Sequence, residues 1–239
     1  MKEITNNTLD KLRQYDTPTI CNIVELFEVR PHDKGYMNSS IKANFPEMPP
    51  MVGFAATATF RGSGAPMKNQ KISSVVEQIE RFEELSGPPV VVFQDIDNPP
   101  VAATFGEIMC STYQKFGSTG LITSGAGRDL DQVKAINYPV FTSCTICAHG
   151  YVHIPEVHVP VHVGGIVIYP NDLLHGDCNG ITTIPLDIAS EVADIAEKYV
   201  DAERITLDIL RKDELDSKAY SEAFDHMMAE IDRLRKLVQ

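Results

Sequence analysis

The sequence predicts an α/β protein with a helical C-terminal extension, and three patterns carry that prediction. Short apolar runs alternate with helical patterns between Val90 and Ser143, as in sheets covered by helices. Every second residue from Val157 to Val163 is valine, which gives a strand one apolar face. Charged amphipathic segments run from Asp187 to Arg211 and from Ser217 to Val238. We therefore expect a domain over residues 1–185 and a helical extension over residues 186–239 that packs on the domain or on a neighbouring subunit.

The elements before the alternating region are predicted from turn residues and spacing. A helix over Leu9–Phe27 restarts at Pro18, because Asp16 or Thr17 can cap its second part and proline is favoured at an early helical position. The other elements of this half are an irregular proline-rich loop over Arg30–Met51, a strand over Val52–Phe60 and a helix over Lys71–Leu85.

The central region contains a continuous apolar run, Val90–Phe93, which suits a strand covered on both faces. The remaining predicted elements are two helices, Gly106–Phe116 and Asp129–Ile136, and three strands, Gly120–Thr123, Pro139–Ser143 and Ile181–Ile184.

Charge and composition exclude several classes of protein. The 239-residue chain is 43% hydrophobic and carries a formal net charge of −12. An acidic surface repels phosphate backbones, so we expect no nucleic-acid partner. The N-terminus lacks an apolar core and no run approaches eighteen apolar residues, so we expect a cytoplasmic protein without a membrane segment.

The cysteines and histidines allow a metal site as an alternative. Five cysteines form an odd set, and Cys144 and Cys147 make one CxxC without a second, so we expect small buried thiols rather than a redox or zinc centre. Four histidines, His149, His153, His158 and His162, lie within fourteen residues. A zinc site there is the weaker interpretation, because His158 and His162 on one strand are too far apart to share an ion.

The sequence predicts a ligand-binding site at the end of the strand Gly120–Thr123. Small residues, Ser124–Gly127, lead into Arg128 and Asp129 at a helix start. Open α/β sheets bind ligands beyond the carboxyl ends of their strands, and a helix start favours an anion. Arg128 and Asp129 could bind a carboxylate and a cation there. From the dipeptide alone, a surface ion pair is the more common arrangement.

A wider pattern favours the functional interpretation. Twenty residues separate Gly106-Glu107 from Arg128-Asp129, and this pattern resembles the signature of the RraA-like family. That family includes the 4-hydroxy-4-methyl-2-oxoglutarate and 4-carboxy-4-hydroxy-2-oxoadipate aldolases. Three further stretches resemble the family's motifs in the same order: Val52–Thr57, Gly164–Asp172 and Gly176–Pro185. The resemblance covers roughly residues 9–185, the length of an ordinary single domain.

The resemblance implies a swivelling β/β/α fold, a ring-shaped homotrimer or hexamer, and a divalent-metal-dependent lyase. Such an enzyme cleaves or decarboxylates a small 2-oxo acid through a pyruvate enolate. Asp129 would bind Mg²⁺ or Mn²⁺, Arg128 would stabilise the enolate oxygen, and Glu107 would position or deprotonate a water. The implied substrate-binding residues are Gly106, Ile108, Met109 and Arg128.

Two departures from the family pattern bear on the metal. Ser124 stands where the family commonly has aspartate, and Gln132 stands where many metal-dependent members have an acid. The alternative function is a non-catalytic regulator, because the family's name-giving members bind and inhibit an RNA-degrading endonuclease. The physiological substrate and any acidic residue supplied by a neighbouring subunit are not specified by the sequence.

Overall fold

The computed structural model describes residues 4–70 and 72–239 and divides the chain into two compact units. One unit consists of residues 33–185, and the other of the residues up to 32 together with 186–239. Each unit is described by itself below.

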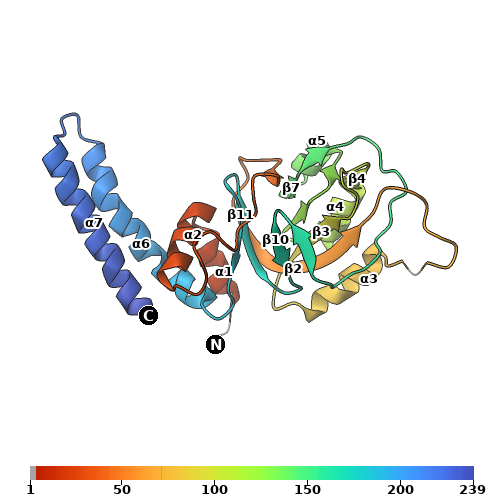
Figure 1. The fold of residues 1–239 in the computed structure, drawn as a ribbon, viewed down its shortest axis with the longest axis horizontal. Helices are drawn as coiled ribbons and strands as arrows, with labels where there is room; N and C mark the ends of the chain where they lie inside the picture. Colours follow the sequence, from red (N-terminus) through yellow and green to blue (C-terminus); the bar gives the residue numbers. More distant parts are fainter. Residues whose placement is uncertain (1–3, 71) are drawn as a thin grey trace. The chain divides into compact units, whose positions relative to one another are not determined.

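The 33–185 unit is built on a seven-stranded mixed sheet with the strand order β1-β7-β5-β3-β2-β11-β12 (Figure 1). Strands β7, β5, β3 and β2 are parallel, whereas β1, β11 and β12 are each antiparallel to their neighbours. The strand bounds are β1 Lys42–Ala43, β2 Met51–Phe60, β3 Pro89–Asp95, β5 Gly120–Thr123, β7 Val140–Thr142, β11 Leu173–Asp177 and β12 Gly180–Ile184. The five strands predicted for this sheet are confirmed, with shifts of a few residues at their ends.

Both faces of this sheet are covered, as the apolar run of β3 predicts. Val90 and Val92 point into one hydrophobic cluster, and Val91 and Phe93 point into another. Successive side chains of a strand alternate between faces, so a strand buried on both sides must be apolar throughout. All ten residues of β2 are buried for the same reason.

One face of the sheet packs against helices. The helices are α3 Val75–Glu80, which continues as a 3₁₀ turn over Arg81–Glu84, α4 Glu107–Lys115 and α5 Leu130–Ala135. Ser74 caps α3 by accepting the N–H of Glu77 at 3.0 Å, so this helix begins later than the predicted Lys71–Leu85. Residue 71 itself lies outside the described residues.

The opposite face packs against a hairpin formed by β9 Val161–Val163 and β10 Ile166–Ile168. Gly164 and Gly165 join the strands with positive φ angles of 58° and 82°, as a two-residue hairpin turn requires. The predicted strand Val157–Val163 is wrong over its first half. His158 has a left-handed φ of 58°, which breaks the extended backbone before Pro160.

A small parallel sheet completes this unit. It consists of β4 Ala103–Phe105, β6 Ala126–Gly127 and β8 Cys144–Thr145, in the order β4-β6-β8. Each strand follows closely on the end of a main-sheet strand, so the small sheet continues the carboxyl ends of β3, β5 and β7. The predicted swivelling β/β/α fold is confirmed.

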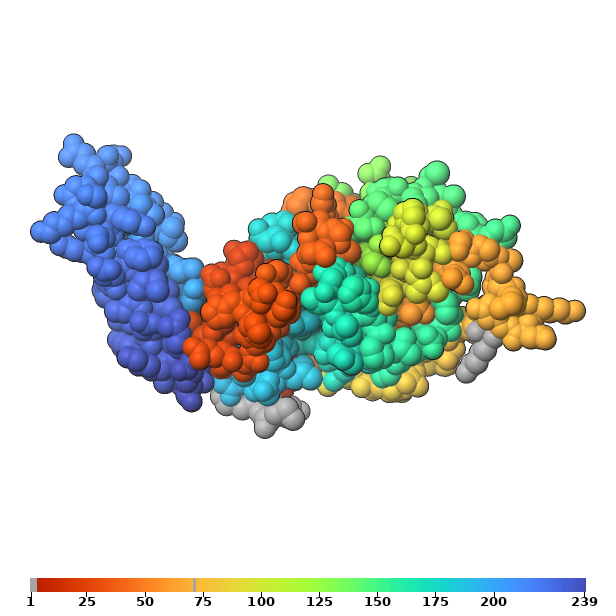
Figure 2. Space-filling view, in the orientation of Figure 1, coloured from red at the N-terminus to blue at the C-terminus, as the bar shows by residue number. Residues whose placement is uncertain are grey.

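The segment 61–70 projects from the surface of this unit and is visible in orange in the space-filling view (Figure 2). Its first residues are held by Asp97, whose carboxylate accepts the backbone N–H groups of Gly62 at 2.8 Å and Ser63 at 2.9 Å. These hydrogen bonds, with that of the Ser63 hydroxyl, lower the pKa of Asp97 although burial opposes the shift.

The second unit is helical and contains α1 Asn6–Leu12, α2 Thr17–Leu26, α6 Ala189–Leu210 and α7 Ser217–Val238. Asp16 caps α2 by accepting the N–H of Thr19 at 2.8 Å, as predicted. The apolar faces of α1 and α2 pack on α6, and α7 runs alongside α6 (Figure 1). This packing groups residues 4–32 with the C-terminal helices, and the predicted domain boundary at residue 185 stays a prediction. Within the described part of the chain, no helix has the length and apolarity that a membrane crossing requires.

Candidate active site

The site is built where β5 meets the small sheet. Ser124 follows β5, and its hydroxyl accepts the backbone N–H of Asp95 at 2.9 Å. A Cβ on Gly125 would lie 2.5 Å from the Thr104 hydroxyl and 2.6 Å from Asp95 Oδ2. The crossing of these segments therefore requires glycine, which explains the run of small residues after the strand.

Arg128 and Asp129 follow at the start of α5. Asp129 is the N-cap and has a left-handed backbone, with φ 55° and ψ 39°. Aspartate tolerates this conformation at a modest cost, and such residues are concentrated at functional sites. Nε of Arg128 lies 3.9 Å from Asp129 Oδ2, and its Nη1 donates to the carbonyl oxygen of Cys147 at 3.5 Å.

The start of α4 faces this pair. The backbone N–H of Glu107 donates to Asp129 Oδ2 at 3.0 Å. A Cβ on Gly106 would lie 2.5 Å from the same oxygen and 3.1 Å from Arg128 Nε, so only glycine permits this approach. Ile108 and Met109 occupy the first turn of α4, where backbone N–H groups have no carbonyl of their own helix to bond.

These segments enclose a cavity of about 450 Å³. Five of the six predicted site residues line it: Gly106, Ile108, Met109, Arg128 and Asp129. Glu107 is exposed and is not among the residues that line the cavity, but its backbone N–H donates to Asp129. Additional lining residues that the sequence did not predict for this site are Val75, Ala103, Thr104, Phe105, Thr112, His149 and Val152.

The donor set tests whether a divalent cation fits. Among the described residues, no group of three or more His, Cys, Asp or Glu side chains could hold a metal ion. Asp129 offers one carboxylate, whose Oδ2 is engaged by Glu107 and whose Oδ1 accepts no hydrogen bond from any described residue. Mg²⁺ commonly binds through one or two carboxylates and keeps several waters. A cation of that kind therefore fits this site, whereas a fully protein-ligated zinc does not.

The comparison with family models identifies the chain. Residues 17–183 match the model described as "RraA-like: Aldolase/RraA". The chain belongs to the RraA-like family.

A curated relative matches part of the chain. Over 114 residues, the chain is 32% identical to a protein of Halalkalibacterium halodurans named "Putative 4-hydroxy-4-methyl-2-oxoglutarate aldolase". That match covers 47% of this chain and 54% of the relative, so the chain spans about half the length of the relative.

Two solved structures share the fold. An uncharacterized protein from Pseudomonas syringae pv. tomato superposes with a TM-score of 0.71 at 21% identity, covering 95% of this chain and 96% of that one. RraAS2 of Streptomyces coelicolor, described as an unusual member of the RNase ES inhibitor RraA protein family, superposes with a TM-score of 0.68 at 18% identity. That match covers 86% of this chain and 98% of the other.

The two departures from the RraA-like pattern have clear positions. Ser124 stands where the family commonly has aspartate. Its hydroxyl accepts the backbone N–H of Asp95 at the end of β3, and Ser124 does not line the cavity. Gln132 is exposed on α5 and does not line the cavity. Asp129 is thus the single acidic residue among the described cavity-lining residues.

A buried carboxyl group lies beside Gly125. Asp95 is 8% exposed, its Oδ1 accepts the N–H of Asp97 at 2.9 Å, and its Oδ2 has no partner among the described residues. Burial raises the pKa of Asp95 to about 6, and the nearby charge of Asp97 adds to the effect. Thr104 Oγ1 and Asp95 Oδ2 lie 2.5 Å and 2.6 Å from the position that a Cβ on Gly125 would take, and Thr104 lines the cavity whereas Asp95 does not.

The prediction of buried thiols is wrong for three of the five cysteines. Cys110 is buried, whereas Cys144, Cys147 and Cys178 are exposed. The CxxC lies on an edge strand and the loop after it, so its side chains have no core to enter.

The four clustered histidines have separate surroundings. His149 lines the cavity, and His153 is buried with Nδ1 2.7 Å from the carbonyl oxygen of Tyr151. His158 pairs with Glu84 at 3.4 Å, and the backbone N–H of His162 donates to the Gln94 side chain.

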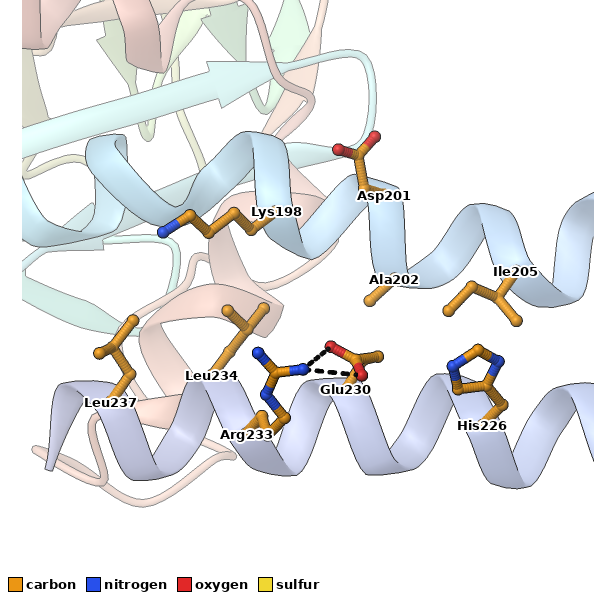
Figure 3. Close-up of a pocket in the computed structure, with 9 residues that line it drawn as sticks. All are labelled: Lys198, Asp201, Ala202, Ile205, His226, Glu230, Arg233, Leu234 and Leu237. Atoms are coloured by element: carbon orange, nitrogen blue, oxygen red, sulfur yellow. Dashed lines mark hydrogen bonds and ion pairs between the residues drawn. The ribbon is translucent and has the colours of Figure 1, made fainter.

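A second cavity of about 460 Å³ lies between α6 and α7 in the helical unit (Figure 3). Its charged residues come from the two helices, and Arg233 binds both carboxylate oxygens of Glu230 on its own helix at 3.2 Å. The strained backbone and convergent N–H groups found beside Asp129 are absent from the described residues here. The chemistry therefore points to the first cavity.

Proposed function

We propose that this chain is a divalent-metal-dependent lyase that cleaves or decarboxylates a small 2-oxo acid. One observation carries the proposal: Arg128 and Asp129, at the start of α5, meet the start of α4 in a single cavity. Such a substrate needs three elements: the positive charge of an arginine, a helix start that binds an anion, and a carboxylate that binds a metal ion.

Asp129 is the residue that would hold the cation, Mg²⁺ or Mn²⁺, through the oxygen that faces no described donor. The ion supplies a Lewis acid that withdraws charge from a ketone oxygen. The N–H of Glu107 fixes the other oxygen of Asp129 and keeps the carboxylate turned toward the cavity.

The remaining groups orient the substrate. Backbone N–H groups of Ile108 and Met109 would bind its carboxylate, because a helix start carries a partial positive charge. Arg128 would donate to the ketone oxygen, and its hydrogen bond strengthens as negative charge develops there. The 3.5 Å hydrogen bond to Cys147 occupies one of its five N–H donors and leaves others for the substrate.

Aldol cleavage breaks the bond between C3 and C4 and leaves the electron pair on a pyruvate enolate. The C4 hydroxyl loses a proton and becomes a carbonyl group, and C3 gains a proton to give the methyl group of pyruvate. We assign the proton transfer to a water that the side chain of Glu107 would position, since Glu107 is exposed and its backbone lies against Asp129. Decarboxylation of oxaloacetate passes through the same enolate.

The test is pyruvate release from oxaloacetate and from a panel of 4-hydroxy-2-oxo acids. It is measured with Mg²⁺, with chelator, and in Arg128→Ala. We expect metal-dependent turnover that the substitution lowers by at least about 100-fold, the usual cost of removing a transition-state donor. Arg81→Ala, which removes an exposed arginine paired with Glu84, is the matched control and should retain activity. Release no faster than with free metal ion would contradict the proposal.

The assembly belongs to the same proposal. We expect a cytoplasmic homotrimer or hexamer, as the family resemblance implies. Light scattering coupled to gel filtration measures the mass directly and would contradict this expectation by giving the 26.4 kDa of one chain.

The competing proposal is a protein-binding regulator without catalysis. Its support is the net charge of −12, which suits a basic partner, and a fold shared with RraAS2. A pure binding protein has no need for a strained aspartate facing an arginine in a cavity, so we place the lyase first.

A further inference from the structure

One face of the hairpin formed by α6 and α7 is covered by α2 along only part of its length. The Asn22 side chain of α2 is hydrogen-bonded to Tyr199 and to Glu203 on α6. Arg235 of α7 lies near enough to Tyr199 to act on it electrostatically, so this end of α7 borders the same face. The hairpin continues well beyond α2 (Figure 1). Toward the turn that joins α6 to α7, α2 therefore leaves this face uncovered.

On α6, the residues that continue this face are leucines. Leu207 and Leu210 follow Glu203 by four and seven residues, so they lie on the side of α6 that packs on α2. Leu207 is 45% exposed and Leu210 is 50% exposed. The apolar stripe of α6 thus runs beyond α2 and reaches solvent.

On α7, the matching residues are Phe224 and Met228. They precede Arg235 by eleven and seven residues, and these spacings place all three on one side of a helix. Phe224 is 40% exposed and Met228 is 38% exposed. Apolar side chains that are exposed singly need no partner, whereas a cluster of them marks an interaction site. We call this cluster the distal apolar face, and it consists of Leu207, Leu210, Phe224 and Met228.

A hydrogen bond between the two helices shows which residues are level along the hairpin. The Thr206 hydroxyl donates to the carbonyl oxygen of Ala223 at 3.3 Å. The two helices run in opposite directions, and each rises about 1.5 Å per residue. Arg204, two residues before Thr206, is therefore level with Asp225, two residues after Ala223. Both side chains are exposed beside the distal apolar face, so both signs of charge border it at one height.

We propose that the distal apolar faces of two copies of this chain pack together as a four-helix bundle. A two-fold axis parallel to the hairpin places α6 of each copy opposite α7 of the other, with the helices antiparallel and their heights unchanged. Leu207 then lies within about two residues' rise of Phe224 of the second copy. Arg204 lies level with Asp225 of the second copy, so opposite charges meet at both ends of the contact.

The charges favour a second copy over an unrelated partner. A two-fold contact requires a surface that complements itself, so each charge must meet its opposite on the same surface. Arg204 and Asp225 meet that condition because they are level. Within one chain Arg204 pairs with Asp201 of its own helix at 2.6 Å through one nitrogen, and a guanidinium group has further donors for a second carboxylate. The inference does not depend on the lyase function.

The first experiment measures the mass by light scattering coupled to gel filtration. If every chain is paired, the wild type contains an even number of chains, and of the trimer and the hexamer only the hexamer fits. Phe224→Glu places a charge in the apolar contact and should halve the mass, while circular dichroism should show that the helices are retained. Leu237→Glu, at a 64% exposed position of α7 outside the distal apolar face, is the control and should keep the wild-type mass.

The possible masses separate this inference from the expected ring. A wild-type trimer would overturn the pairing and keep the ring, and a single chain would contradict both. A mass of Phe224→Glu equal to that of the wild type would overturn the pairing. No readout is enzymatic, so failure of the pairing is distinct from failure of the lyase.

A charge reversal tests the two-fold arrangement. Asp225→Arg would face Arg204 of the second copy, and we expect the like charges to weaken association of the hairpins at least about tenfold. The double variant Arg204→Asp with Asp225→Arg restores opposite charges and should recover the wild-type association. Association of the double variant as weak as that of Asp225→Arg, with the helices retained, would overturn this arrangement.

Discussion

The backbone N–H of Glu107 donates to Oδ2 of Asp129 across 3.0 Å, so the start of α4 fixes the orientation of the carboxylate that begins α5. Asp129 also has a left-handed backbone, which a single hydrogen bond of this kind helps to maintain. The cation-binding group of the proposed lyase is thus held by main-chain geometry from two helices, and two predictions follow from that arrangement.

Asp129→Asn should abolish metal binding while keeping the fold. The asparagine Oδ1 can still accept the Glu107 N–H, and asparagine tolerates a left-handed backbone, but the negative charge is lost. We expect Mn²⁺ affinity, measured by electron paramagnetic resonance, to fall at least about 100-fold, which corresponds to roughly 2.7 kcal/mol. Asp131→Asn is the matched control, since Asp131 is exposed on the same helix and does not line the cavity. Unchanged affinity in Asp129→Asn would show that the cation binds elsewhere.

Gly106→Ala tests whether the site needs the close approach of α4 to Asp129, because the substitution adds a steric clash without straining the backbone. Gly106 has φ −148°, which alanine can adopt, but the new methyl group would lie 2.5 Å from Asp129 Oδ2. We expect a loss of about 1–3 kcal/mol in the free energy of unfolding, typical of overpacking, and a loss of Mn²⁺ affinity. Lys115→Ala at the other end of α4 is the control. Wild-type affinity in Gly106→Ala would mean that the close approach of α4 to α5 is not needed.

The main sheet could be predicted because its strands are locally distinctive. β3 and β5 are short apolar runs bounded by polar or small residues, and burial on both faces leaves that pattern no ambiguity. The prediction of a strand over the whole of Val157–Val163 was wrong because the alternation of valines shows which side chains can share a face. It does not show whether the backbone stays extended. His158 accepts a positive φ, which periodicity does not reveal.

The candidate site was predictable in its charged half. Arg128 and Asp129 follow a strand end, where ligands bind in α/β sheets, and the resemblance supplied the start of α4. The position of Val75 and Val152 in the cavity wall could not be predicted. Each reaches the cavity from a segment distant in the chain, and no sequence motif surrounds it. Likewise, nothing local shows that Cys144 lies on an edge strand and Cys147 in the loop after it, where both thiols are exposed.

Tyr113→Phe should destabilise the unit through one buried network. The Tyr113 hydroxyl donates to Gln78 Oε1 at 2.6 Å, and Gln78 Nε2 donates to the carbonyl oxygen of Ala56 at 3.0 Å. Removing the hydroxyl leaves a buried acceptor unpaired, which costs about 1–3 kcal/mol. Hydrogen exchange of the β2 amides measures the change. Tyr151→Phe, at a 61% exposed position, should have no effect, and equal protection in both variants would contradict the network's role.

Asp95 should make the 33–185 unit less stable as the pH rises from about 4 to about 6. Its pKa is about 6 in the folded protein, above the usual 3.8, so between these values the folded state binds more protons than the unfolded state. Ionisation of the buried carboxyl group therefore costs stability, up to roughly 3 kcal/mol above pH 6.

Asp95→Asn removes this ionisation and can retain the acceptor for the Asp97 N–H. We expect the variant to be more stable than the wild type at pH 8 and to lose that advantage at pH 4. Hydrogen exchange of the β3 amides at several pH values, corrected for intrinsic exchange rates, provides the measurement. The exposed Asp131→Asn again serves as control. A stability difference between Asp95→Asn and wild type that does not change with pH would show that the carboxyl group titrates normally, and that solvent or an ion reaches its free oxygen.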